Sequence, residues 1–151
     1  MEAIVTPFIS AAVLTFKTML QIDINPGAPS EKKGHAHGTD ISGTIGLSGL
    51  AQGFVTLGFP KTVALHIVQA MLGMEMTEID SDVVDAIGEI TNIVAGNAKL
   101  ELTVFNLSIS LPTVVVGSDH RVEGMSGIEV FVVPFSSALG DFMMEVSLKP
   151  L

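Results

Sequence analysis

The sequence contains no cysteine, no tryptophan and no tyrosine among its 151 residues. The absence of cysteine excludes disulfide bonds, thiolate metal ligands and cysteine nucleophiles, and it agrees with a reducing compartment. The chain also lacks a phosphate-binding G-x-x-x-x-G-K loop, a G-x-S-x-G nucleophile elbow and an H-E-x-x-H zinc motif. The familiar nucleotide-binding and hydrolase chemistries therefore have no motif in this chain.

Positive charge is scarce, with 7 Lys and Arg against 16 Asp and Glu and a formal net charge of -9. So few basic residues do not give the electrostatic footprint that binding to nucleic acid or to an anionic membrane surface requires. We therefore expect neither nucleic acid nor membrane as a partner. An acidic chain suits instead a partner with a locally positive site.

No apolar run at the amino terminus is long enough to cross a membrane without interruption. The chain begins Met1-Glu2 without the basic region of a signal peptide. Its first apolar stretch meets Pro7 and Lys17 before it reaches the roughly 20 residues that a span needs. We expect a cytoplasmic protein that forms one domain over residues 1–151. Hydrophobic residues make up 48% of the chain, which indicates some surface buried against another chain.

Hydrophobic periodicity gives the expected order of elements. It predicts helices over residues 6–21, 60–72 and 81–102. Alternating patterns predict strands over residues 41–48, 52–59, 104–116, 127–135 and 140–149. Residues 25–39 are rich in turn formers and charge, and we expect a connector there. This order predicts an α+β fold with a mostly antiparallel sheet packed by helices.

Each half of the chain begins with a helix followed by strands, which predicts two related α/β halves. One register of the two halves places Ala11 on Glu89 and Leu14 on Asn92. In that register the first helix keeps the apolar positions of the second helix but has no polar residues in place of Glu89 and Asn92. The repeat therefore predicts one functional site per chain.

The helix predicted over residues 81–102 has two unlike faces. Its apolar face is expected to pack on the sheet and consists of Val83, Ile87, Ile90, Val94 and Ala98. Its opposite face carries polar and small residues at i, i+4, i+7 and i+11, which are Asp85, Glu89, Asn92 and Gly96. Ser81 is the expected N-cap.

Gly96 and Asn92 are unusual on an exposed helix face. Glycine in a helix interior costs about 1 kcal/mol relative to alanine, and asparagine competes for nearby backbone groups. One interpretation is that another surface approaches closely here. The alternative is that Gly96-Asn97 is a C-cap that ends the helix near Ala95.

The run D-A-I-G-E-I-T-N-I-V-A-G-N-A, which spans residues 85–98, resembles the E-x-x-N helix of the CheC/CheX/FliY group of chemotaxis phosphatases. The single motif and the short chain are most similar to the CheX branch. The close match covers about 20 residues, and the order of elements matches more loosely across the rest. Members of this group hydrolyse the aspartyl-phosphate of CheY-type response regulators.

The resemblance implies a role for each candidate residue. Asn92 would orient the attacking water, and Glu89 would pair with the active-site lysine of the receiver domain. Gly96 would permit close approach of the partner, and Asp85 is a candidate contact at the rim. No cofactor or metal is expected on this chain, because Mg²⁺ belongs to the receiver of the phosphorylated CheY-type response regulator.

The group also implies a homodimer, and the apolar final strand, F-M-M-E-V-S-L, is the expected edge for a second copy. A different function stays open: a noncatalytic module that captures a response regulator or a flagellar-switch protein through the same helix. A pure binding module does not need the water-orienting amide of Asn92, so the complete motif favours the phosphatase. The pair His35 and His37 is expected to be a solvated part of the connector rather than a metal site.

Overall fold

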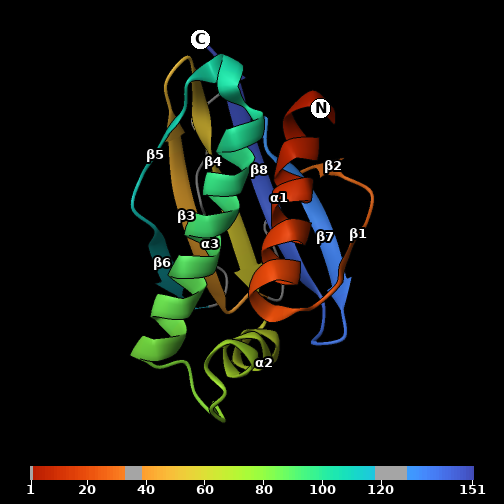
Figure 1. Ribbon diagram of the computed structural model, residues 1–151, viewed down its shortest axis with the longest axis vertical. Coiled ribbons are helices and arrows are strands. Elements are labelled where there is room, and N and C mark those ends of the chain that lie inside the picture. The colour runs from red at the N-terminus through yellow and green to blue at the C-terminus, as the bar shows by residue number, and fades with distance from the viewer. Residues whose placement is uncertain (1, 33–38, 118–128) are drawn as a thin grey trace.

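The computed structural model describes residues 2–32, 39–117 and 129–151, in which helices pack on an antiparallel sheet (Figure 1). The helices are α1 (Glu2–Leu20), α2 (Lys61–Leu72) and α3 (Ser81–Glu101), and a 3-10 turn η1 (Thr103–Phe105) follows α3. The strands are β1 (Ile24–Pro26), β2 (Ser30–Glu31), β3 (Ile41–Ser48), β4 (Ala51–Phe59), β5 (Ser108–Ile109), β6 (Thr113–Val116), β7 (Phe131–Ser137) and β8 (Phe142–Pro150). The expected α+β class is confirmed.

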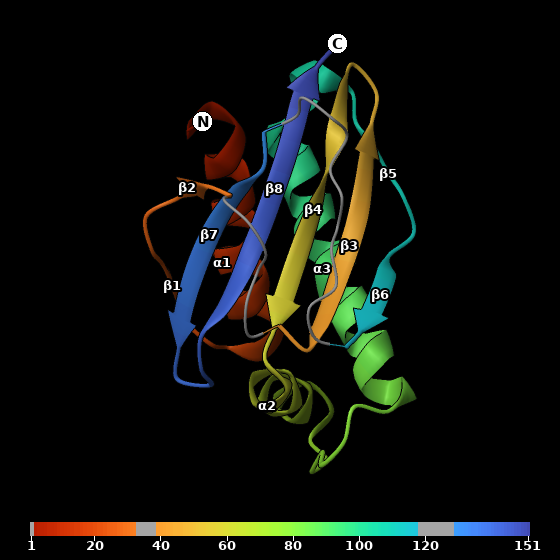
Figure 2. The ribbon, with the colours of Figure 1, turned by 180° about the vertical axis from the view of Figure 1, so that it is seen from behind.

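The sheet has the strand order β1-β7-β8-β4-β3-β5, with β2 also beside β7 and β6 also beside β3. Figure 2 shows it from the side opposite the helices. The final strand β8 lies between β7 and β4 and pairs with both. The expectation that this strand is a free edge for a second copy is therefore wrong. Its apolar sequence reflects a central position, because both of its backbone edges are already used within the chain.

Short edge strands account for two further differences from the sequence-based expectation. The single strand predicted over residues 104–116 is instead η1, β5 and β6, separated by Asn106 in the left-handed region (φ 46°) and by Pro112. The expected connector over residues 25–39 contributes β1 and β2, which pair with β7. Strands of two to four residues are too short to show an alternating pattern.

The hydrophobic core lies between the sheet and the two long helices, α1 and α3, which cover the same face (Figure 1). Phe142, the first residue of β8, contacts three other aromatic rings of this core. The ring centroid of Phe142 lies 5.1 Å from that of Phe16, 5.0 Å from that of Phe59 and 5.3 Å from that of Phe135. Aromatic rings at these separations attract one another beyond simple burial. They join α1, β4, β7 and β8 into one core.

Helix α1 is long and apolar enough, by length and composition, to cross a membrane. In this fold it is a core helix, because Val5, Phe8 and Phe16 are buried against the rest of the chain. It begins at Glu2, before the expected start at Thr6-Pro7. Pro7 lies inside this helix, where it cannot donate the usual hydrogen bond to the carbonyl four residues earlier, and burial of Val5 favours the turn that precedes it.

The sheet has an internal two-fold symmetry. The strands that follow α1 and the strands that follow α3 occupy equivalent places on either side of the centre of the sheet. The short strands after α1 pair with β7, the short strands after α3 pair with β3, and β4 pairs with β8 at the centre. Two related halves explain this symmetry. The register that places Ala11 on Glu89 is wrong, however, because Ala11 is buried whereas Glu89 is exposed.

The burial pattern of the two long helices gives a better register. It pairs Phe8 with Val83, and the same offset then pairs Leu14 with Glu89 and Lys17 with Asn92. Leu14 is 51% exposed and cannot replace a carboxylate. The Lys17 ammonium is 3.0 Å from the Asp23 carboxylate. The surface of α1 that corresponds to the candidate site therefore carries neither chemical group, which agrees with one site per chain.

Helix α3 has nearly the predicted bounds, but its N-cap and the place of Gly96-Asn97 differ from the sequence-based interpretations. Asp80, one residue before Ser81, is the N-cap, and its side chain accepts a hydrogen bond of 3.1 Å from the Val83 N–H. The helix continues through Gly96 and Asn97 to Glu101. The Asn97 amide donates a hydrogen bond of 3.0 Å to the Thr15 hydroxyl, which ties α3 to α1. The C-cap interpretation of Gly96-Asn97 is therefore wrong.

Candidate functional site

Helix α3 presents the predicted polar residues on one surface, which we call the α3 stripe: Asp85, Glu89, Asn92 and Gly96. Asp85 and Glu89 are exposed, while Asn92 and Gly96 are partly exposed. Residues three or four apart on a helix lie on the same face, so Glu89 and Asn92 project toward the same volume of solvent. The structure thus brings together all the candidate residues named from the sequence.

The opposite face of α3 holds the stripe in place. All the predicted apolar residues of this face are buried, namely Val83, Ile87, Ile90, Val94 and Ala98. Gly43 on β3 lets the helix come close to the sheet, because a Cβ at this position would collide with the Thr91 hydroxyl. A rigid sheet beneath α3 fixes where the side chains of the stripe can reach.

Neither Glu89 nor Asn92 makes a side-chain hydrogen bond or ion pair within residues 2–32, 39–117 and 129–151. The other asparagine of the same helix, Asn97, does bond to a neighbour. A carboxylate accepts hydrogen bonds and a carboxamide both donates and accepts them. The stripe therefore offers these groups to an external partner rather than using them to hold the fold.

Internal packing does not require glycine at position 96. A Cβ added to Gly96 would meet no heavy atom within 4 Å. The cost of glycine in a helix interior is thus not offset by any contact within the described part of the chain. The missing side chain leaves free space on the stripe one helical turn beyond Asn92, as the interpretation of close approach requires.

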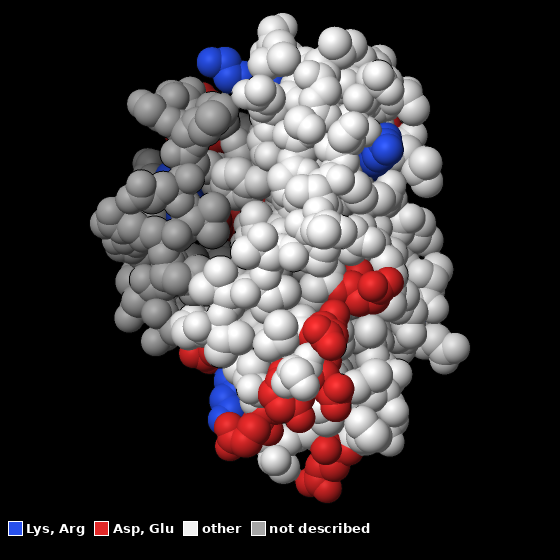
Figure 3. All heavy atoms as spheres, turned by 90° about the vertical axis from the view of Figure 1, so that its left-hand side faces the viewer, with Lys and Arg blue, Asp and Glu red and all other residues white. Residues whose placement is uncertain are grey.

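Acidic side chains continue the stripe toward the amino end of α3. Figure 3 shows a band of acidic side chains along this surface. Going toward that end, Glu89 and Asp85 are followed by Asp82, Asp80 and Glu78. The Lys61 ammonium is 2.9 Å from the Glu78 carboxylate and neutralises only that end of the band. A positive group of a partner would be attracted to this surface.

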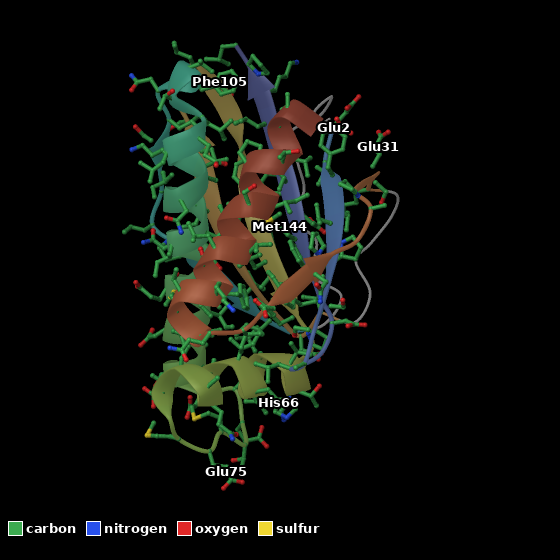
Figure 4. All side chains as sticks on the ribbon, turned by 45° about the vertical axis from the view of Figure 1, so that its right-hand side comes forward. Glu2, Glu31, His66, Glu75, Phe105 and Met144 are labelled. Carbon is green, nitrogen blue, oxygen red and sulfur yellow. The ribbon has the colours of Figure 1, made fainter. Side chains whose placement is uncertain are left out.

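The remaining histidines add nothing to this site. His66 is exposed on α2, where its Nδ1 is 3.4 Å from the Leu139 carbonyl oxygen (Figure 4). His35, His37 and His120 lie outside the described residues. Among the residues that are described, no group of three His, Asp or Glu side chains could hold a metal ion.

Sequence reasoning missed two residues that position the stripe. Asn97 joins α3 to α1, and Gly88 lets β6 pack beside the helix. A Cβ on Gly88 would be 3.3 Å from Val114 Cγ2 and 3.5 Å from Pro112 Cγ. The sequence does contain one indication of this contact: Gly88, a poor helix former, stands in the helix directly before Glu89. Which strand it faces depends on long-range pairing.

This sheet topology, with α1, α2 and α3 packed on it, is that of the CheC-like superfamily: a protein of that superfamily from Shewanella is 33% identical, with a TM-score of 0.87 and coverage of 96% of both chains. The sequence model of the family described as "Chemotaxis phosphatase CheX" matches residues 41–136. The CheY-P phosphatase CheX of Thermotoga maritima is 31% identical over 150 residues, which cover 97% of this chain and 96% of that protein. The chain belongs to the CheX family.

Solved structures agree with this assignment. The chemotaxis protein CheX of Vibrio vulnificus is 33% identical, with a TM-score of 0.87 and coverage of 96% of this chain and 98% of that one. The CheX of Borrelia burgdorferi, solved in a complex with CheY, BeF₃ and Mg²⁺, is 25% identical. Its TM-score is 0.83, and the match covers 96% of this chain and 97% of that one.

Proposed function

We propose that this chain hydrolyses the aspartyl-phosphate of a CheY-type response regulator in chemotaxis. In this proposal Asn92 orients the attacking water and Glu89 pairs with the receiver lysine. The observation that carries it is the bare pair itself: an exposed carboxylate and a partly exposed carboxamide, adjacent on one rigid helix and unused by the fold. Membership of the CheX family supports the reaction.

The chemistry needs little from this chain beyond positioning. An aspartyl-phosphate is already activated, and self-hydrolysis in the receiver lacks a held water. Positioning and charge stabilisation supply most of the catalysis in phosphoryl transfer. The Asn92 carboxamide can accept a hydrogen bond from a water and donate to an oxygen at the same time. It therefore suits a water aligned for in-line attack on phosphorus.

Glu89 has a different role in the proposal. Positions 89 and 92 lie roughly 60° apart around the helix axis, so both side chains reach one shallow pocket. A carboxylate paired with the receiver lysine docks α3 in a single register. We assign it no role as a general base. The divalent cation of the reaction, Mg²⁺, belongs to the receiver in this proposal, and no cofactor is assigned to this chain.

We place the reaction in the cytoplasm. The helix that could cross a membrane by length and composition is instead packed on the sheet through Val5, Phe8 and Phe16. The low content of basic residues also gives no attraction to anionic lipid.

The expected homodimer needs another surface, since β8 is central. We propose the end of the molecule around the carboxyl terminus of α3. Exposed leucines and a valine gather there, with exposed fractions of 60% for Leu50, 73% for Leu100, 75% for Val104 and 79% for Leu151. Backbone hydrogen bonds join the Leu50 N–H to the Phe105 carbonyl (2.8 Å) and the Leu151 N–H to the Leu50 carbonyl (3.0 Å). Figure 4 shows Phe105 at this end, far from His66.

Light scattering tests this surface directly. We expect a dimer at micromolar concentration for the wild type and a monomer for Val104→Lys, because an unpaired charge in an apolar interface is costly. Leu14 is an exposed leucine on α1 outside this surface, and Leu14→Lys serves as a matched control that should stay dimeric. A monomeric wild type would refute the homodimer.

Phosphate release from a phosphorylated CheY-type receiver in Mg²⁺ tests the function. We expect the wild-type chain to accelerate release at substoichiometric amounts, because a catalyst turns over. Binding of the receiver without acceleration would support the noncatalytic capture module instead. A chain that neither binds nor accelerates would refute both functions.

A further inference from the structure

Helix α3 contains a single basic residue, Lys99, in its last turn. The Lys99 side chain is exposed. Within the described parts of the chain it makes no hydrogen bond or ion pair, whereas Lys17, Lys32 and Lys61 each form an ion pair with a carboxylate. The ammonium group of Lys99 is therefore left to solvent or to a partner.

Lys99 lies on the same face of α3 as the stripe, on the side of Asn92 that is opposite to Glu89. It follows Asn92 by seven residues, which places the two positions about 20° apart around the helix axis and about 10 Å apart along it. Gly96 lies between them, and a Cβ added there would meet no heavy atom within 4 Å. Long side chains of a helix lean toward its amino end. The flexible stem of Lys99 can therefore extend over Gly96 toward Asn92.

A role confined to the helix itself would not depend on this position. The residues three and four places before Lys99 are Gly96 and Ala95, so no carboxylate can pair with it along the helix in the usual way. A cation in the last turn does stabilise the helix dipole. Lys17 has the same place in the last turn of α1, which makes it a natural comparison.

Charge changes sign along this face of α3. Asp85 and Glu89 lie on the amino side of Asn92, and Lys99 lies on its carboxyl side. Figure 3 shows the acidic band ending in uncharged surface, with a basic side chain farther along the same face. The face therefore presents a negative group, then the neutral Asn92, then a positive group.

The proposed substrate offers groups of both signs to this face. In the proposed function a receiver lysine pairs with Glu89, and the receiver holds Mg²⁺ beside its phosphoryl group. Proteins bind Mg²⁺ through one or two carboxylates together with phosphate oxygens. A receiver docked with its lysine on Glu89 and its phosphoryl group at Asn92 continues along the helix to Lys99. An ammonium there meets a carboxylate favourably and a second basic group unfavourably.

We propose that Lys99 pairs with a receiver carboxylate at the rim of the phosphorylation site, and that Glu89 and Lys99 together fix the direction in which the receiver docks along α3. This inference rests on the proposed function, because the partner is its substrate. The contact is made equally before and during the reaction, so it governs KM and leaves kcat unchanged. Charges at the rim of an interface act mainly on the association rate and on its dependence on salt.

The test compares Lys99→Gln, Lys99→Glu and Lys99→Arg with Lys17→Gln. The control removes the same charge from the last turn of the other long helix. The ion pair of Lys17 with Asp23 is exposed on both sides, and such pairs contribute little to stability. Steady-state phosphate release gives KM and kcat for the phosphorylated receiver. Rapid mixing with a receiver that carries beryllofluoride and Mg²⁺ gives the association rate constant at two ionic strengths.

Two further measurements separate this role from a structural one. Chemical denaturation reports the loss of the helix-dipole interaction, which Lys99→Gln and Lys17→Gln should show alike. Light scattering reports the oligomeric state, because Leu100 of the proposed dimer surface is the next residue after Lys99. All the variants should keep the oligomeric state of the wild type.

We expect KM to rise about threefold for Lys99→Gln and about tenfold for Lys99→Glu, with kcat within twofold of the wild type. The association rate constant should fall by similar factors, and it should depend less on salt in Lys99→Gln than in the wild type. Lys99→Arg keeps the charge and should keep KM within twofold. Lys17→Gln should leave KM unchanged.

Four results would overturn the inference while the wild type is active and the proposed function stands. An unchanged KM in Lys99→Glu leaves Lys99 with the helix dipole alone. An equal rise in KM for Lys17→Gln assigns the effect to net charge. A fall in kcat with KM unchanged places the ammonium on the phosphoryl group instead of a rim carboxylate. A rise in KM that accompanies loss of the dimer assigns the effect to the dimer surface. An inactive wild type refutes the proposed function itself.

Discussion

Replacing Asn92 with alanine is expected to lower kcat for receiver dephosphorylation by about 100-fold, because loss of a positioned reactant typically costs a factor of this size. The Asn92 side chain makes no hydrogen bond within the described residues, so the free energy of unfolding should change little. Receiver binding should persist, since Glu89 and the rest of the surface remain. Single-turnover phosphate release measures the chemical step, and titration with a beryllofluoride-bearing receiver measures binding.

Asn97 provides a matched control on the same helix. Asn97→Ala removes an identical carboxamide, but one that donates to Thr15 and joins α3 to α1. It should lower the free energy of unfolding by about 1 kcal/mol and leave kcat unchanged. The opposite pattern, with activity lost in Asn97→Ala and kept in Asn92→Ala, would show that rigidity of the helix rather than a positioned water limits the rate.

Asn92→Asp separates geometry from hydrogen bonding. Aspartate is nearly the same size but, when ionised, it only accepts hydrogen bonds. It also places negative charge beside a phosphoryl group that is itself negative. We expect this variant to be no better than alanine. A variant that keeps wild-type kcat would show that the donor of the carboxamide is not needed.

The sequence predicted those parts of the site that depend on local spacing. The apolar residues of α3 recur with the helical period, and their burial leaves Glu89 and Asn92 together on the outside. Strand β3 was predicted with its observed bounds, because eight residues suffice to show alternation. What these side chains do chemically came from the resemblance of the motif and not from its periodicity.

Features set by long-range contacts could not be predicted in this way. Asn97 bonds to Thr15 across 82 residues, and Gly88 faces β6 only because β6 pairs with β3. The final strand is apolar in either a central or an edge position, so its sequence alone does not reveal which neighbours it has. The N-cap shifted by one residue because Asp80 and Ser81 are both good capping residues.

Replacing Glu89 with glutamine is expected to raise KM by 30-fold or more. Truncation of one partner of a desolvated charge pair costs about 2 to 5 kcal/mol, and glutamine keeps the size while removing the charge. Glu89→Lys should be worse, because it would place two ammonium groups together. Steady-state kinetics at two ionic strengths measures the effect: the KM of the wild type should rise with salt more steeply than that of Glu89→Gln.

The variant Glu101→Gln tests whether the effect on KM depends on the position of the lost charge. Glu101 is an exposed glutamate in the last turn of the same helix, away from the stripe, so Glu101→Gln changes the net charge equally and should leave KM nearly unchanged. If both variants raise KM alike, the effect comes from overall charge and Glu89 does not pair with the receiver lysine. If Glu89→Gln lowers kcat with KM unchanged, the carboxylate acts on the water, and the division of roles between Glu89 and Asn92 is wrong. A rise in KM confined to Glu89 leaves Asn92 as the residue that acts on the water.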